Sequence, residues 1–279
     1  MWKAILALAL IANPAAAEMQ RVRLDQRFYL IDLPQTPSGA VILALHGAGG
    51  NPANFAKVSA LSDAALPLGY AVIFAAGVEA EGRRTWNALY CCGEAAAEGV
   101  DDLVFLDSVL ADASERFGLD TGRLYLTGMS NGAMLAETYA VLRGAKAVAG
   151  VSGTLDLSQA PAKPVPLLHI HGRADPVVPY DGGLGRNATA RFTPVEEVIA
   201  AFVAAFGNLS PKAHKFDAVQ DGTSVAQTDY LDPAGRVQVR LISIEGGGHN
   251  WPGGDADRRA ASQEVSATDA ILDFFALHP

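Results

Sequence analysis

The segment Leu124-Tyr-Leu-Thr-Gly-Met-Ser-Asn-Gly-Ala133 places a serine in a sharp turn between an expected strand and an expected helix. A β-branched and aromatic run stops at Gly128, and Gly132 opens an apolar pattern of helical period. A G-x-S-x-G match in this context presents its serine at the carboxyl end of a buried strand. Glycines are needed there because the strand and helix backbones approach closely. Ser130 is therefore a candidate nucleophile, and the alternative is a Gly-Ser loop that only caps a helix.

Strand-like and helix-like segments mostly alternate on both sides of this turn. Strands of this kind, separated by helices, predict an α/β fold with a mostly parallel central sheet and helices on both faces. Residues 78–99 form an irregular insertion, and no repeat or linker divides residues 18–279, which we expect to be one domain. The short segment between the strand at 146–151 and the Pro-rich residues 161–166 leaves no room for a lid. The expected strands are 21–24, 28–33, 41–45, 70–75, 123–127, 146–151, 167–171 and 237–244, and the expected helices are 52–66, 101–117, 133–142, 195–206 and 266–277.

Residues 1–17 have the pattern of an export signal. Lys3 supplies a positive charge, residues 5–12 are apolar, Pro14 interrupts them, and Ala15-Ala16-Ala17 suits cleavage before Glu18. The apolar run is too short to cross a bilayer. We expect a secreted or periplasmic protein without a membrane anchor.

The net charge of the chain is −9, and it becomes −10 when Lys3 leaves with the signal. An acidic chain without basic runs argues against nucleic acid or an anionic membrane as partner. Neutral esters and sugars remain compatible with this charge. The sequence predicts no cofactor, and the oligomeric state stays open.

The two cysteines are the adjacent Cys91 and Cys92. Export permits disulfides, so a vicinal bond is favoured, while two free thiols or an intermolecular link remain open. A metal site needs more ligands than this pair provides.

Two later loops supply the partners that a serine nucleophile needs. His249 lies in a Gly-rich loop after the strand at 237–244, where packing explains a histidine poorly, and Asp175 follows the strand at 167–171. Asp175 would orient the imidazole, and His249 would take the Ser130 proton and return it to the leaving group. Asp156 is the main rival acid and Asp181 a weaker one.

An acyl-transfer site also needs fixed donors for the oxyanion. The backbone N–H groups of Asn131 and Ala48 are the candidates, the second because glycines around it expose backbone amides to substrate. His46 would orient this loop rather than titrate.

Other residues have weaker functional interpretations. Trp251 and Trp86 lie in loops and could bind substrate, with core packing as the alternative, equally so for Trp86. His169 and His171 share one sheet face, but no third ligand completes a metal site. Gly253-Gly-Asp-Ala-Asp257 lacks the spacing of a calcium loop.

Seven blocks of the sequence form one further pattern. They are Leu45-His-Gly-Ala-Gly-Gly-Asn51, Thr85-Trp-Asn87, Cys91-Cys-Gly93, Gly99-Val-Asp-Asp102, Thr127-Gly-Met-Ser-Asn-Gly-Ala133, His169-Ile-His-Gly-Arg-Ala-Asp-Pro-Val-Val-Pro-Tyr180 and Gly246-Gly-Gly-His-Asn-Trp-Pro-Gly253. Together these blocks resemble the polyhydroxybutyrate depolymerase family of esterases, which is related to feruloyl and acetylxylan esterases. The resemblance implies an α/β-hydrolase fold and an exported serine esterase with Ser130, Asp175 and His249 as its triad. We expect no linker and no separate polymer-binding domain of the kind that polymer-degrading members have, which favours soluble hydroxyalkanoate oligomers, or acyl and feruloyl groups on polysaccharide, as substrates. A peptidase on the same fold, or a non-catalytic glycan- or polyester-binding protein, is the alternative.

Overall fold

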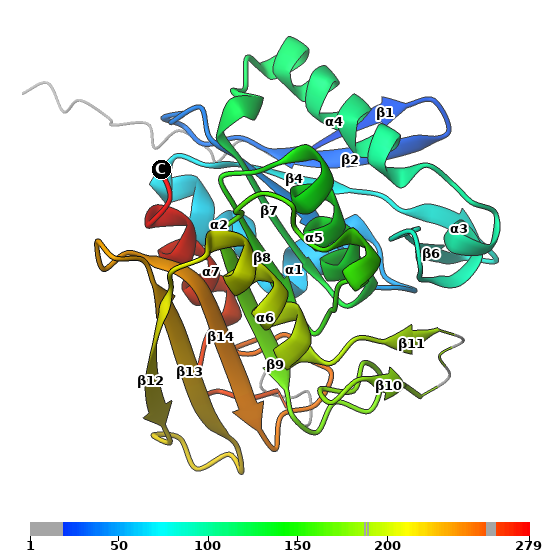
Figure 1. Ribbon diagram of the computed structural model, residues 1–279. Coiled ribbons are helices and arrows are strands. Elements are labelled where there is room, and N and C mark those ends of the chain that lie inside the picture. The colour runs from blue at the N-terminus through cyan, green and yellow to red at the C-terminus, as the bar shows by residue number, and fades with distance from the viewer. Residues whose placement is uncertain (1–18, 187, 189, 255–260) are drawn as a thin grey trace, which may run out of the picture.

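A computed structural model describes residues 19–186, 188, 190–254 and 261–279, so the expected export signal lies outside the described residues. The main feature of these residues is a ten-stranded sheet in the order β1-β2-β4-β3-β7-β8-β9-β14-β13-β12 (Figure 1). Every neighbouring pair from β4 to β14 in this order is parallel. The parallel strands are β3 (Val41–Leu45), β4 (Ala71–Ala75), β7 (Leu124–Met129), β8 (Ala147–Val151), β9 (Leu167–Gly172) and β14 (Val237–Glu245).

Antiparallel strands extend the sheet at both edges. At one edge lie β1 (Gln20–Leu24) and β2 (Arg27–Asp32), and at the other lie β13 (Ser224–Leu231) and β12 (Ser210–Phe216). The sequence analysis did not identify β12 and β13. Most of β12 is exposed, so no buried apolar run marks it as a strand.

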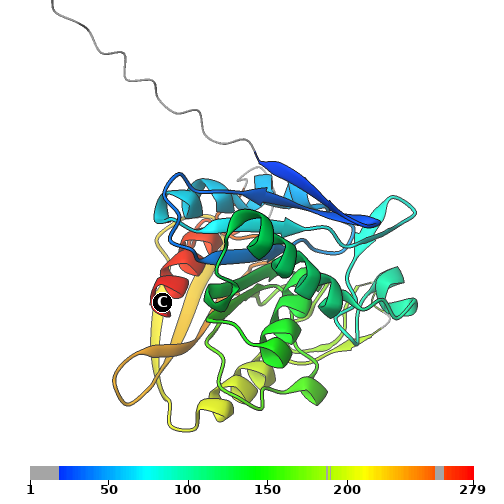
Figure 2. The same cartoon turned by 90° about the horizontal axis from the view of Figure 1, so that it is seen from above.

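Helices cover both faces of the sheet, as the sequence predicted. Alternate residues of β3 face opposite cores: Leu43 packs in the core with α4, α5 and α6, and Ile42 in the core with α1, α2 and α7. Figure 2 shows these two helical layers on either side of the strands. The helices are α1 (Pro52–Ser59), α2 (Leu61–Ala65), α4 (Asp102–Phe117), α5 (Asn131–Arg143), α6 (Val195–Phe206) and α7 (Ala267–Ala276).

The single helix expected over residues 52–66 is wrong. Ala60 adopts a left-handed conformation with φ 49°, which ends α1 and separates it from α2.

The remaining elements are short. Among them, η3 is the sole helix between β8 and β9 in the described chain, which fits the expected lack of a lid there. These are η1 (Leu66–Leu68), β5 (Val78–Ala80), β6 (Arg83–Thr85), α3 (Gly93–Ala97), η2 (Thr121–Arg123), η3 (Leu157–Gln159), β10 (Gly183–Leu184) and β11 (Arg191–Phe192). Among the described residues, none of the helices is long and apolar enough to cross a membrane.

Candidate active site

Ser130 occupies a strained turn between β7 and α5. Its backbone has φ 55° and ψ −125°, a conformation that costs energy for a residue other than glycine. The Ser130 N–H donates to the Val151 carbonyl at 2.8 Å, which ties the turn to β8. A Cβ on Gly132 would lie 2.2 Å from the Leu45 carbonyl oxygen, so only glycine lets α5 approach β3 this closely. The sequence motif therefore folds into the expected turn.

The loops after β9 and β14 bring Asp175 and His249 together. The His249 Nδ1 lies 2.7 Å from the Asp175 Oδ2. Asp175 is buried, and its Oδ1 accepts the N–H groups of Val177 at 2.8 Å and Val178 at 2.9 Å. Burial opposes ionisation of Asp175, but hydrogen bonds from His171 and His249 outweigh it and hold the pKa of this carboxyl well below its usual range. The arrangement orients an imidazole against a fixed carboxylate.

Ser130 and His249 line the same cavity, of about 290 Å³. Glycines 47, 49 and 50 form part of its wall, and Phe55, Val58 and Met129 add apolar surface. The described residues show no hydrogen bond between the Ser130 hydroxyl and His249. Catalytic hydrogen bonds often tighten only when substrate binds, so the lack of a Ser130–His249 hydrogen bond is compatible with proton transfer between these residues.

The loop after β3 borders this cavity and carries unpaired backbone donors. In the described chain the N–H groups of Ala48 and Asn131 have no acceptor, whereas the Gly49 N–H donates to the Arg84 carbonyl at 2.7 Å. His46 holds the loop through two contacts. Its Nδ1 lies 2.8 Å from the Gly47 carbonyl, and its Nε2 accepts the Gly77 N–H at 3.0 Å. Burial lowers the pKa of His46 to about 4, so it is a neutral positioning group.

The two rival acids, Asp156 and Asp181, do not contact His249 in the described chain. Asp156 begins η3, where its carboxylate accepts the backbone N–H of Ser158 at 3.0 Å and the Ser158 hydroxyl at 2.5 Å. Asp181 is exposed on the loop after β9. Of the three candidates, Asp175 is the one that contacts His249.

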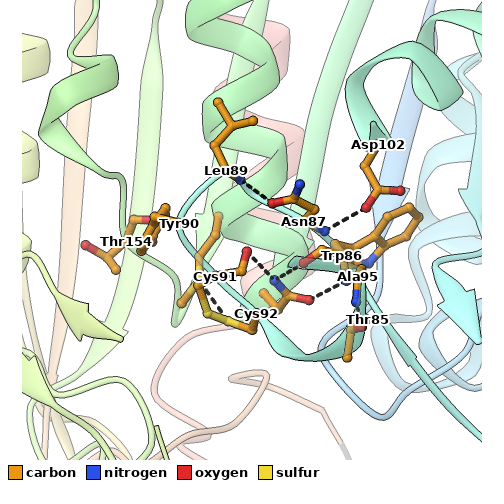
Figure 3. The surroundings of a disulfide bond; sticks show 12 residues. Thr85, Trp86, Asn87, Leu89, Tyr90, Cys91, Cys92, Ala95, Asp102 and Thr154 are labelled. Atoms are coloured by element: carbon orange, nitrogen blue, oxygen red, sulfur yellow. Dashed lines mark hydrogen bonds between the residues drawn. A yellow bond between two sulfur atoms is a disulfide. The ribbon is translucent and has the colours of Figure 1, made fainter. Parts of the chain in front are cut away.

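Trp86 and Trp251, the two candidate substrate-binding residues, are both buried. Trp86, labelled in Figure 3, is fully buried. Its indole N–H donates to the His46 carbonyl at 2.8 Å. Trp251 is 4% exposed, packs edge-on against Phe55 and donates to the Thr268 hydroxyl at 3.1 Å. Neither ring lines the cavity of Ser130. Their burial agrees with the alternative of core packing, and a role of either ring in substrate binding stays a prediction.

The insertion after β4 is hydrogen-bonded to Asn131, the residue that follows the candidate nucleophile. The Asn131 side chain accepts the Trp86 N–H at 2.7 Å and donates to the Trp86 carbonyl at 2.9 Å and the Cys91 carbonyl at 3.4 Å. Cys91 and Cys92 form the vicinal disulfide that the sequence favoured (Figure 3). From the sequence we expected only the backbone N–H of Asn131 to act at the site. That its side chain also holds the insertion could be suspected only from its place directly after Ser130.

The histidine pair and residues 253–257 were the two segments weighed as metal ligands in the sequence. His169 and His171 lie against each other in β9, and the described residues contain no cluster suited to a metal ion. Asp255 and Asp257 of the calcium-like stretch lie outside the described residues.

Comparisons with known proteins connect this geometry to esterases. The putative esterase NocK of Nocardia uniformis subsp. tsuyamanensis is 29% identical over 263 residues, covering 86% of this chain and 75% of that protein. Feruloyl esterase B of Piromyces equi is 26% identical over 222 residues, which cover 75% of this chain but only 39% of that protein. The acetyl xylan esterase of Aspergillus awamori shares the fold, with a TM-score of 0.62 and 13% identity over 93% of this chain and 99% of that one.

A family model described as esterase PHB depolymerase matches residues 29–184, from β2 to β10, and so includes the turn that carries Ser130. The structural relatives have the same arrangement of a mostly parallel sheet between helices. The chain therefore belongs to the esterase PHB depolymerase family and is a carboxylic ester hydrolase with the α/β-hydrolase fold.

Proposed function

We propose that this protein is an exported serine esterase that cleaves soluble carboxylic esters through an acyl-enzyme. The observation that carries the proposal is the 2.7 Å contact between His249 and Asp175 beside a cavity that also exposes Ser130 in its strained turn. Residues 18–279 would form a single catalytic domain.

In the proposed reaction, the His249 Nε2 takes the hydroxyl proton as the Ser130 Oγ attacks the ester carbonyl carbon. The carbonyl oxygen gains the negative charge and meets the Ala48 and Asn131 N–H groups. His249 then gives its proton to the departing alcohol, leaving Ser130 acylated. Water repeats the sequence, with His249 as base, and releases the acid and the free serine.

The cavity favours a small acyl group. Its volume of about 290 Å³ lies at the low end of ligand pockets, and its apolar side is formed by Phe55, Val58 and Met129. Hydroxyalkanoate oligomers are the first substrate class that fits. Acetyl or feruloyl esters of plant polysaccharide are the second, favoured by the similarity to a feruloyl esterase.

Hydrolysis of short p-nitrophenyl esters by the wild type and Ser130→Ala tests the proposed nucleophile. We expect the variant to lose at least about 10³-fold in kcat, and equal rates would remove the assignment. Hydroxybutyrate oligomers should then be compared with acetylated and feruloylated xylan. Amide turnover above ester turnover would instead favour a peptidase, and glycan binding without turnover a binding protein.

Export is a separate part of the proposal, based on the charged and apolar pattern of residues 1–17. The protein recovered outside the cytoplasm should begin at Glu18 when its N-terminus is sequenced. A mature protein that retains Lys3 would contradict cleavage after Ala17.

A further inference from the structure

A row of buried polar side chains runs from the middle of α5 to the carboxylate of Asp175. The Glu137 Oε1 lies 2.9 Å from the His169 Nδ1, and the His169 Nε2 lies 3.2 Å from the His171 Nδ1. The His171 Nε2 then lies 3.5 Å from the Asp175 Oδ2, the oxygen that contacts His249. The row therefore connects a glutamate in the core to the candidate triad.

The fold makes room for these groups and excludes water from them. Glu137, His169 and His171 are each at most 1% exposed. A Cβ on Gly150 of β8 would lie 2.1 Å from the Glu137 Oε1, so glycine at that position accommodates the carboxyl group. A buried glutamate without a compensating partner would be costly. Its contact with His169 therefore has to be favourable.

Hydrogen-bond donors and acceptors along the row can be assigned from its outer end. The Val178 carbonyl lies 2.8 Å from the His171 Nε2 and can only accept, as can the Asp175 carboxylate, so this nitrogen carries a proton. Burial lowers the pKa of His171, which leaves its ring neutral and its Nδ1 an acceptor. The His169 Nε2 must then be protonated to donate to it.

The contact between Glu137 and His169, at the inner end of the row, needs one further proton. A neutral His169 protonated on Nε2 has a bare Nδ1 facing the Glu137 Oε1, and two lone pairs at 2.9 Å repel. One further proton has to lie between these two groups. In the reverse tautomers, both histidines carry their proton on Nδ1 and Glu137 is ionised. The bare Nε2 of His171 would then face the Val178 carbonyl and the Asp175 carboxylate, which can only accept.

Neighbouring hydroxyls do not supply that proton. Tyr90, whose pKa is raised by burial and by the charge of Glu137, donates to the Thr154 carbonyl at 2.7 Å. Tyr180 packs against the His171 ring but donates to the Glu196 carboxylate at 2.6 Å. The Glu137 Oε2 has no hydrogen-bond partner among the described residues.

We propose that Glu137 and His169 hold one shared proton as a net-neutral buried pair, and that this proton fixes the tautomer of His171 so that its Nε2–H steadies Asp175. Glu137, His169 and His171 are then positioning residues, which act on His249 through Asp175. The link to catalysis rests on the proposed function, whereas the proton assignment does not.

Nitrogen-15 NMR of histidine-labelled wild-type protein tests the assignment directly. The expected result is a protonated Nε2 and an unprotonated Nδ1 on His171, with a protonated Nε2 on His169. Protonation of the His171 Nδ1 in place of its Nε2 would overturn the proposal. This readout does not depend on esterase activity, so it separates failure of the proton assignment from failure of the Ser130 assignment.

Two substitutions of one residue test the effect on the reaction. Glu137→Gln can donate an amide N–H to the His169 Nδ1 and should keep kcat within about twofold and the same His171 tautomer. Glu137→Leu cannot, and we expect about a tenfold loss of kcat with KM unchanged, together with mixed His171 tautomers. Thr138→Val is the matched control, because it removes a buried polar atom of the same helix that lies outside the row. Equal kcat in Glu137→Leu and wild type, or equal losses in both Glu137 variants, would overturn the proposal.

Discussion

Replacing Asp175 by asparagine should abolish most of the activity while leaving the loop in place. The asparagine Oδ1 can still accept the N–H groups of Val177 and Val178, now at 2.8 and 2.9 Å. Its amide nitrogen takes the place of the oxygen that lies 2.7 Å from the His249 Nδ1. The amide donates to that nitrogen, so His249 carries its proton on Nε2 and cannot accept the proton of Ser130.

The same change in serine proteases with this triad lowers kcat about 10⁴-fold, which corresponds to about 5 kcal/mol in the activation barrier. The assay is kcat for p-nitrophenyl acetate, with thermal unfolding to show that the variant is folded. Asp156→Asn is the matched control, because Asp156 binds only its own turn. A folded Asp175→Asn enzyme that keeps more than about a tenth of the wild-type kcat would refute the reasoning, as would an equal loss in the control.

Three further predictions concern stability. Because burial lowers the pKa of His46 from 6.5 to about 4, the unfolded chain binds more protons at this residue between these values, and the contribution of His46 to the unfolding free energy should fall by about 2–3 kcal/mol as the pH drops from about 7.5 to about 4.5. The unfolding free energy of His46→Asn, measured with urea, should depend less on pH than that of the wild type. Equal slopes against pH would contradict this. Gly132→Ala places a Cβ 2.2 Å from the Leu45 carbonyl and should cost about 3 kcal/mol of unfolding free energy; a change below about 1 kcal/mol would show that α5 can move. The Cys91–Cys92 bond closes almost no loop, so its reduction should leave the melting temperature nearly unchanged and should alter hydrogen exchange mainly in the insertion. A large drop in the melting temperature would disprove this.

Much of the fold could be predicted because its strands are short apolar runs that end in glycine-rich loops. The same reasoning placed Ser130, Asp175 and His249 after separate strands, since the carboxyl ends of parallel strands meet at one edge of a sheet. Strand β12 could not be found in this way, because an exposed edge strand carries no buried face. The break at Ala60 was missed for a related reason, since alanine favours helix and only its packing imposes a left-handed turn.

Side-chain partners were harder to predict than positions. Trp86 lies in the insertion that the sequence predicts to be irregular, so no local pattern indicated that its ring is buried beside His46. The alternation of His169 and His171 correctly predicted a shared face, but their partner Glu137 lies on α5, 32 residues earlier than His169. A glutamate among the buried residues of α5 was the available signal, but its meaning depends on how α5 packs over β8, which brings Glu137 to His169 of β9.

The central claim is that the hydroxyl of Ser130 is a nucleophile activated by His249. Mass spectrometry of the folded protein after treatment with a fluorophosphonate probe tests it most directly. The account predicts a single adduct on Ser130, and no adduct in the His249→Ala variant. A folded wild-type protein that gives no adduct, or an adduct on another residue, would contradict it.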